Sequence, residues 1–234
     1  MYLNNFGFKR YPFHVTPDPE FIFLTACHEE ALNRLRFGLD ANSGFIVLTG
    51  EVGSGKTTIL RRFINELKCQ FALVFNPQDD FIKLLRQILD ELEIRYEKDE
   101  DGPALIERLN ERALSLHGRG EQLVIVIDEA QNLSLEVLES IRLLTNLETD
   151  KAKLLDIILA GQPELSGKLD SVRLIQLKQR IGMRYHLLPL SQEEMGPYIR
   201  HRLNIAGGNP DSIVFTPGAL KKIFFYSGGV PRLV

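Results

Sequence analysis

Eight consecutive residues of this chain have the types and the spacing of a loop that binds phosphate. The segment fits the pattern G-x-x-x-x-G-K-[ST] and reads Gly50, Glu51, Val52, Gly53, Ser54, Gly55, Lys56, Thr57. Its three glycines allow the backbone to curl with several N–H groups pointing inward, where they attract phosphate oxygens. The Lys56 ammonium would contact the β and γ phosphates of a nucleotide, and the Thr57 hydroxyl would ligate Mg²⁺. We count the adjacent Thr58 among the expected nucleotide-binding residues.

The alternative interpretation of this segment is a chance match in an ordinary glycine-rich turn. At average residue frequencies, roughly one chain in a hundred of this length would contain such a match. The surroundings favour a phosphate-binding loop, because the apolar strand predicted at Phe45–Thr49 precedes the segment and a predicted helix, Thr57–Leu67, follows it.

A pair of carboxylates follows the apolar run Leu123–Ile127. In an open α/β sheet the carboxyl ends of the strands face the ligand crevice, so Asp128 and Glu129 are expected at the same edge as the glycine-rich loop. Asp128 would hold Mg²⁺, and Glu129 would orient and polarise an attacking water molecule. The alternative is that the pair caps a turn or a helix.

Two further polar residues, Gln131 and Asn132, come directly after this pair. They could contact the same site or help to cap a helix predicted to begin at Ser134. We favour the capping interpretation, because polar side chains before a helix commonly satisfy its first N–H groups.

The rest of the chain supplies elements that would position these residues. Strands alternate with helices and most strands are almost wholly apolar, which indicates a parallel sheet covered on both faces. We expect further strands at Phe71–Phe75, Leu154–Ala160 and Met183–Leu187. The expected helices are His28–Asp40, Asp79–Leu92, Pro103–Leu116, Ser134–Leu147, Val172–Arg180, Gln192–Ala206 and Pro217–Tyr226, besides Thr57–Leu67.

Two segments depart from this alternation. The first 27 residues are expected to be irregular. After Leu190 only helices are expected, so we predict a nucleotide-binding domain over residues 1–190 and a small helical domain over residues 191–234.

Composition limits the classes of protein to consider. The 234 residues are 44% hydrophobic and 25% charged, with a net charge of −3, so the basic excess typical of nucleic-acid-binding proteins is absent. We find no signal peptide and no apolar run near the roughly 20 residues that a membrane span needs. A soluble cytoplasmic chain is expected, with Cys27 and Cys69 as reduced thiols.

Several segments together resemble the AAA+ ATPases. These are the glycine-rich loop, IDEAQNL, LAGQPEL, LKQRI and SGGVPRL, and the opening MYLNNFGFKRYPFHVTPDPEFIF is similar to that of the ExeA-type family, general secretion pathway protein A. The resemblance implies a P-loop NTPase fold of the ASCE type, followed by a truncated α-helical lid. It also implies ATP with Mg²⁺ as the ligands, ADP as a product, and a homo-oligomer.

The resemblance also implies roles for individual residues. Gln162 falls at the sensor 1 position, and the alternative for it is a hydrogen bond at a strand end. Arg180 falls at the arginine-finger position, which would reach a neighbouring subunit's ATP; Arg173 and Arg184 are rivals, and a surface salt bridge is the alternative. Arg232 matches sensor 2, an arginine of the lid that contacts the γ-phosphate, and the alternative is a solvated charge.

We make two further predictions, one for the aromatic residues near the N-terminus and one for the C-terminal end. Phe13 or Phe21 could stack on the adenine base, but core packing is the interpretation we favour. Longer ExeA-type relatives have a membrane span and a periplasmic region downstream. We therefore expect this chain, which stops just after Arg232, to be a fragment of such a protein.

Three functions follow from these patterns. The first is an ATPase for assembly of a secretion or pilus-type envelope system, associated with a membrane component. The second is a DNA-associated ATPase of the transposition or replication-regulator type, against which the acidic net charge argues. The third is a nucleotide-gated scaffold without hydrolysis, against which Glu129 argues.

Overall fold

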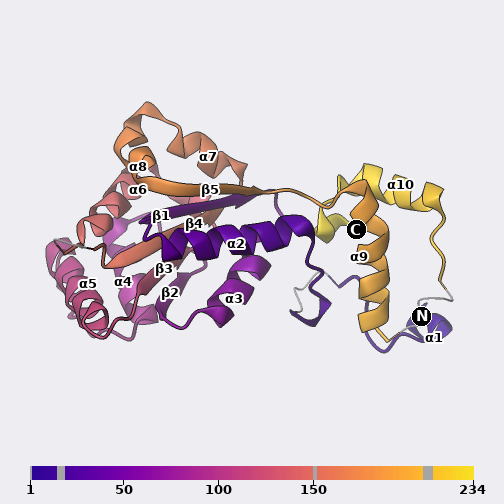
Figure 1. The fold of residues 1–234 in the computed structure, drawn as a ribbon, viewed down its shortest axis with the longest axis horizontal. Coiled ribbons are helices and arrows are strands. Elements are labelled where there is room, and N and C mark those ends of the chain that lie inside the picture. Colours follow the sequence, from indigo (N-terminus) through magenta and orange to yellow (C-terminus); the bar gives the residue numbers. More distant parts are fainter. Residues whose placement is uncertain (1, 15–18, 150–151, 208–212) are drawn as a thin grey trace.

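The computed structural model describes residues 2–14, 19–149, 152–207 and 213–234. A parallel sheet with helices on both faces forms the larger part, and a smaller group of helices lies beyond one end of it (Figure 1). The strand order is β2-β3-β4-β1-β5 and all pairings are parallel. The strands are β1 (Phe45–Gly50), β2 (Gln70–Val74), β3 (Leu123–Ile127), β4 (Leu155–Gly161) and β5 (Ile181–Leu187). The predicted α/β class with a parallel P-loop-type sheet is confirmed.

The central strands are apolar along their whole length because both of their faces are covered. Every residue of β1, β3 and β4 is buried. Successive side chains alternate between two clusters, so Phe45 of β1 packs on one face and Ile46 on the other. Since all strands run the same way, the residues after β1, β3 and β4 meet at one edge of the sheet.

Helices cover the two faces unequally. One face is covered by α2 (Ala26–Asp40) and α3 (Lys56–Glu66). The other face is covered by α4 (Phe81–Glu91), α5 (Gly102–His117), α6 (Leu135–Ile141), α7 (Pro163–Leu169) and α8 (Ile175–Arg180). Short 3₁₀ turns connect some of these elements: η2 (Ala130–Asn132), η3 (Arg142–Asn146) and η4 (Val172–Leu174).

A third apolar cluster joins the two ends of the chain. It lies around α9 (Gln192–Ile205), with α10 (Pro217–Ser227) packed beside it and the 3₁₀ turn η6 (Pro231–Leu233) near the end of the chain. Phe8 and Phe21 are buried in this cluster, and the Lys9 N–H donates to the Ala206 carbonyl oxygen at 2.8 Å. The N-terminal segment therefore packs against the lid helices, as its position beside α9 in Figure 1 illustrates. The domain boundary at residue 190 stays a prediction.

The structure corrects three details of the expected elements. The first 27 residues are not wholly irregular, because they include α1 (Tyr2–Phe6), the 3₁₀ turn η1 (Pro19–Phe21) and the start of α2, while residues 15–18 lie outside the described part. The predicted helices 134–147 and 172–180 are each divided into an α-helical and a 3₁₀ portion. Helix α7 was not predicted; it begins at Pro163, where the fixed φ of proline suits a first helical turn.

Two expectations from composition can be compared with the described residues. Cys27 and Cys69 are both free thiols, as expected. None of the described helices combines the length and the apolar character that crossing a membrane requires.

Candidate active site

The glycine-rich loop connects the end of β1 to the start of α3. Gly53 and Gly55 have φ angles of 81° and 105°, a left-handed backbone that a side chain would strain. Gly55 precedes α3, and no side chain in the described part of the protein caps this helix. The first N–H groups of α3 therefore remain available, and with the helix dipole they favour an anion at this point.

Lys56 is buried and its ammonium folds back over the loop. Nζ donates hydrogen bonds to the carbonyl oxygens of Gly50, at 2.8 Å, and of Glu51, at 2.9 Å. Burial lowers the pKa of Lys56, while Glu129 and Asp128 act in the opposite direction. The ammonium thus lies at the mouth of the loop, where a phosphate oxygen would be a stronger acceptor than a neutral carbonyl.

Thr57 and Asp128 join the two predicted motifs directly. The Thr57 hydroxyl donates to Asp128 Oδ2 at 2.6 Å, and the Glu129 N–H donates to Asp128 Oδ1 at 2.9 Å. Burial raises the pKa of Asp128, and the hydrogen bond from Thr57 opposes that shift. Hydroxyl and carboxylate oxygens are ligands that Mg²⁺ prefers, so this pair fits the implied ion. Within the described residues no group of three or more His, Cys, Asp or Glu side chains could hold a metal ion.

Glu129 lies beside Thr57 and Asp128, and two glutamine side chains contact its carboxylate. Its φ is 54°, which turns the chain sharply after β3. Gln131 Nε2 donates to Glu129 Oε2 at 2.6 Å, and Gln162 Nε2 lies 3.4 Å from the same oxygen. The structure therefore brings Gln162, for which the resemblance implies a sensor 1 role, to Glu129 of the acidic pair.

The capping role expected for Gln131 and Asn132 is wrong. Ser134 caps α6 with its own hydroxyl, which accepts from the Val137 N–H at 3.3 Å. Asn132 donates its backbone N–H to the Glu129 carbonyl oxygen, and the side chain of Gln131 turns to the carboxylate. Gln131 contacts the site because the turn at Glu129 redirects the chain before α6 begins.

Arg232 approaches the loop from the lid. A Cβ added at Gly53 would lie 2.5 Å from Arg232 Cβ, so glycine at this position leaves room for the arginine. Arg232, Lys56, Glu129 and Gln162 all line one cavity of 1220 Å³ between the sheet and the lid. This volume exceeds the upper end of the usual range for ligand pockets.

Comparison with known proteins gives the family. A model of the AAA domain family matches residues 39–169, just over half of the chain. The chain belongs to the AAA domain family.

One curated relative bears on the narrower resemblance. General secretion pathway protein A of Aeromonas hydrophila is 43% identical over 236 residues, which cover 100% of this AAA chain. The expected relation to the ExeA-type AAA+ ATPases is confirmed. The chain spans only 43% of that relative's length.

Solved structures of two other proteins share the fold. The ORC2 protein of Aeropyrum pernix has a TM-score of 0.67 and 18% identity, over 96% of this chain and 64% of that one. A Walker-type ATPase of Pyrococcus abyssi has a TM-score of 0.64 and 17% identity, over 95% and 69%. At such identities the likeness concerns the fold alone.

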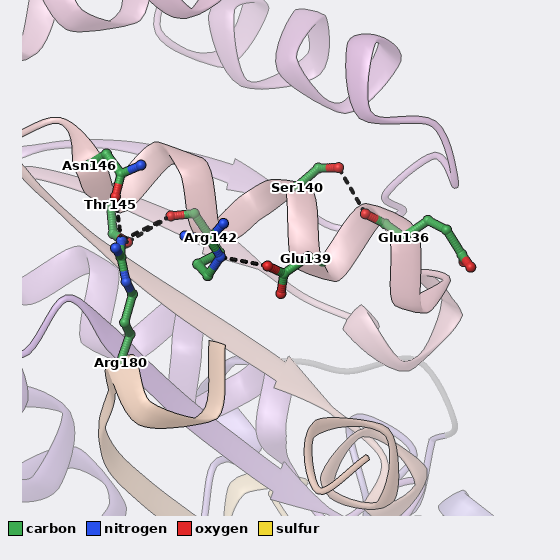
Figure 2. A network of polar contacts seen from close by, with 7 residues as sticks. All are labelled: Glu136, Glu139, Ser140, Arg142, Thr145, Asn146 and Arg180. Atoms are coloured by element: carbon green, nitrogen blue, oxygen red, sulfur yellow. Dashed lines mark hydrogen bonds and ion pairs between the residues drawn. The ribbon is translucent and has the colours of Figure 1, made fainter. Parts of the chain in front are cut away.

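Arg180 lies away from the glycine-rich loop of its own chain. It precedes β5, whose first residue Ile181 pairs with Phe45 at the start of β1, whereas the loop follows the other end of β1. Its Nη1 donates to three oxygens of the α6–η3 segment, as Figure 2 shows. The acceptors are the Arg142 carbonyl at 3.3 Å, Thr145 Oγ1 at 2.6 Å and Asn146 Oδ1 at 2.7 Å. A contact with a neighbouring subunit stays a prediction.

The two rival arginines form ion pairs on the same chain. Arg173 pairs with Glu136 of α6, and both side chains are largely exposed. Arg184 pairs with Asp170, at 3.1 Å. The salt-bridge interpretation therefore fits these two residues, while Arg180 has only uncharged acceptors in this network.

The aromatic residues of the N-terminal segment line the far end of the cavity. Phe13 and Phe21 both contribute, and Phe21 is buried in the third cluster, in agreement with core packing. The Arg202 guanidinium lies 5.8 Å and 5.1 Å from the centres of these two rings. Arg202, which the sequence analysis did not single out, also donates to the Tyr198 hydroxyl at 3.1 Å.

The sequence analysis also missed a histidine that contacts the loop. His28 of α2 is buried, and its Nε2 lies 3.3 Å from the Ser54 carbonyl oxygen. His28 also occupies the third position of a capping box with Thr25. This T-x-x-H spacing is a local signal for the start of α2, but it does not indicate the contact with the loop.

Proposed function

We propose that this chain binds ATP with Mg²⁺ between its glycine-rich loop and its acidic pair, and that it hydrolyses the γ-phosphate. The observation that carries the proposal is the 2.6 Å hydrogen bond from the Thr57 hydroxyl to Asp128. A potential metal ligand from each motif thus meets at one point, and Thr57 lines the same cavity as Lys56 and Arg232. ATP rather than GTP is proposed from membership of the AAA family.

Each residue then has a defined task. The loop N–H groups and the first turn of α3 bind the β and γ phosphates, and Lys56 turns from its two carbonyl acceptors to phosphate oxygens. Glu129 orients a water molecule toward the γ-phosphate and accepts its proton. Bound Mg²⁺ would be held by Thr57 and Asp128 and would neutralise charge on the phosphate oxygens. Arg232 would contact the γ-phosphate from the lid.

The site assignment is tested with Lys56→Ala. Phosphate release should fall to the uncatalysed level, because the ammonium that stabilises the transferring phosphoryl group is gone. The matched control is Lys83→Ala, an exposed lysine on α4, which should hydrolyse ATP at the wild-type rate. Hydrolysis at the wild-type rate by Lys56→Ala would refute the assignment.

We further propose that hydrolysis serves the assembly of a secretion or pilus-type envelope system, through a homo-oligomer completed by Arg180. Support for this role comes from the name of the relative, general secretion pathway protein A. In a host strain that lacks the gene, wild-type protein should restore secretion or pilus assembly and the Lys56→Ala variant should not. Full restoration by the inactive variant would separate the ATPase from this process.

The charge distribution argues against the DNA-associated alternative. Arg36 and Arg62 both pair with Glu66, and Arg34 pairs with Glu30, so three of the basic residues on α2 and α3 have acidic partners. Binding to labelled DNA should therefore be absent with ATP, even at low salt, where phosphate contacts are strongest. Salt-dependent binding would restore the alternative.

A further inference from the structure

Gln131 joins two separate parts of the site through one amide group. Its Nε2 donates to Glu129 Oε2 at 2.6 Å, and its Oε1 accepts from the backbone N–H of Gln162 at 3.0 Å. The second contact links residues 31 positions apart, from the turn after β3 to the end of β4. The side chain is thus held at both ends of its amide.

Donor and acceptor chemistry fixes which way this amide faces. A backbone N–H can only donate, so the oxygen of Gln131 must face Gln162. The amide nitrogen then faces Glu129 and donates to Oε2 of its carboxyl group. The two hydrogen bonds therefore require the same orientation, and a flipped amide would place donor against donor and acceptor against acceptor.

The surrounding chain is shaped to receive this side chain. A Cβ added at Gly161, the last residue of β4, would lie 2.7 Å from Gln131 Oε1. Lys168 of α7 donates from Nζ to the carbonyl oxygens of Gln131 and Leu133, each at 2.7 Å. Gly161 leaves space for the Gln131 side chain, and Lys168 donates to the Gln131 carbonyl oxygen. Both contacts constrain the position of Gln131.

We propose that Gln131 is a positioning residue that orients Glu129 for hydrolysis; this inference rests on the proposed ATPase function. Both glutamine side chains contact Oε2 of Glu129, and among the described residues no hydrogen bond falls on Oε1. Oε1 is therefore free to accept the water molecule that attacks the γ-phosphate. Without Gln131 the carboxylate rotates, and the fraction of time in which Oε1 faces the γ-phosphate falls.

The test uses Gln131→Met, which keeps the length and bulk of the side chain but removes the amide. We expect kcat for ATP hydrolysis to fall roughly ten- to a hundredfold, the scale of a misplaced catalytic group. The affinity for ATP should stay at the wild-type value, and the thermal unfolding midpoint should fall by only a few degrees, because two hydrogen bonds are lost. The matched control is Gln192→Met, an exposed glutamine at the start of α9, which should leave kcat unchanged.

A double-mutant cycle separates positioning from a general structural effect. If Gln131 acts through Glu129, Gln131→Met should cause no further loss in a Glu129→Gln background, measured as single-turnover phosphate release. An equal fold-loss in both backgrounds, or a wild-type kcat for Gln131→Met in an active protein, would overturn the inference. Absence of hydrolysis by the wild-type protein would instead contradict the proposed function itself.

Discussion

The Nε2 atom of His28 lies 3.3 Å from the carbonyl oxygen of Ser54, so helix α2 contacts the glycine-rich loop through one imidazole. The other ring nitrogen, Nδ1, faces the backbone N–H of Thr25 at 3.2 Å. Because that N–H can only donate, Nδ1 carries a lone pair and Nε2 carries the proton that is donated to Ser54. The Thr25 contact therefore requires a neutral imidazole, whereas Nε2 can donate to Ser54 in either protonation state.

Replacing His28 by Ala should weaken nucleotide binding. The Ser54 carbonyl would lose its partner and the loop would sample more conformations, at a cost of about 1 kcal/mol for one net hydrogen bond. We expect the Kd for ATP to rise several-fold, measured by titration with a fluorescent analogue. His117→Ala, at the last residue of α5, serves as the control and should bind with unchanged affinity.

His28 should also make stability depend on pH. Burial, the dominant effect, lowers the pKa of His28 from its ordinary value of 6.5. The unfolded chain then binds the proton more readily than the folded protein, so the free energy of unfolding should fall as pH drops below about 6.5. His28→Gln should lack this loss when urea unfolding is compared at pH 7.5 and pH 5.5. An equal fall in both proteins would contradict the prediction.

Asp156 should make stability depend on pH in the opposite direction. It lies near the start of β4, at the sheet edge away from the glycine-rich loop. It is buried on β4, accepts the Gly44 N–H at 2.8 Å, and its pKa is raised by burial from 3.8 to about 6. The folded protein therefore takes up this proton first, and the contribution to stability increases as pH falls from 6 toward 4. Each unit of such a shift corresponds to about 1.4 kcal/mol.

Asp156→Asn removes the titrating group: the amide oxygen can still accept from Gly44, but the bond that Oδ2 accepts from Gln122 Nε2 at 3.2 Å is lost. The stability of the variant relative to wild type should therefore be highest near pH 7 and should fall between pH 6 and pH 4. Asp99→Asn, at an exposed position, is the control and should show no such trend. A constant difference across this range would exclude Asp156 as the source.

Thr57→Val tests the link between the loop and Asp128. The variant keeps the shape of the side chain but removes the hydroxyl that donates to the carboxylate at 2.6 Å. Hydrolysis with Mg²⁺ should fall by about a hundredfold or more, since a metal ligand is lost. Binding of ATP without Mg²⁺ should change little. Thr57→Ser, which restores the hydroxyl, should recover most of the rate.

The proposed action of Arg180 on a neighbouring subunit is tested by mixing two inactive variants. Arg180→Ala subunits keep an intact nucleotide site, and Glu129→Gln subunits keep Arg180. If Arg180 acts in trans, the mixture should hydrolyse ATP although neither variant does so alone. No recovery, with both variants folded and assembled by light scattering, would contradict the assignment. Arg173→Ala, the rival, should stay active alone.

Local patterns predicted the parts of the site that lie close together in sequence. The apolar run at 123–127 matches β3 to the residue, and its end places Asp128 at the edge where Thr57 also lies. Periodicity and the direction of parallel strands are enough for this, because both act over a few residues.

Contacts between distant segments could not be derived in the same way. His28 and Ser54 are 26 residues apart, and Gln131 and Gln162 are 31 apart. The first contact depends on how α2 packs beside the glycine-rich loop, and the second depends on how β4 lies beside the turn that follows β3. Hydrophobic periodicity specifies neither arrangement. The prediction therefore gave Gln131 and Asn132 a capping role at the start of α6. In the structure, the turn at Glu129 directs the Gln131 side chain to the Glu129 carboxylate instead.

The burial of Phe8 and Phe21 in the cluster around α9 ties the N-terminal segment to a helix that contributes Tyr198 and Arg202 to the lining of the cavity. If α9 swings toward the sheet when ATP enters, residues near Phe8 travel with it instead of remaining with the strands. A fluorophore placed near Phe8, paired with one on α5, would therefore report this movement of α9 in real time, with neither dye on a residue that lines the cavity.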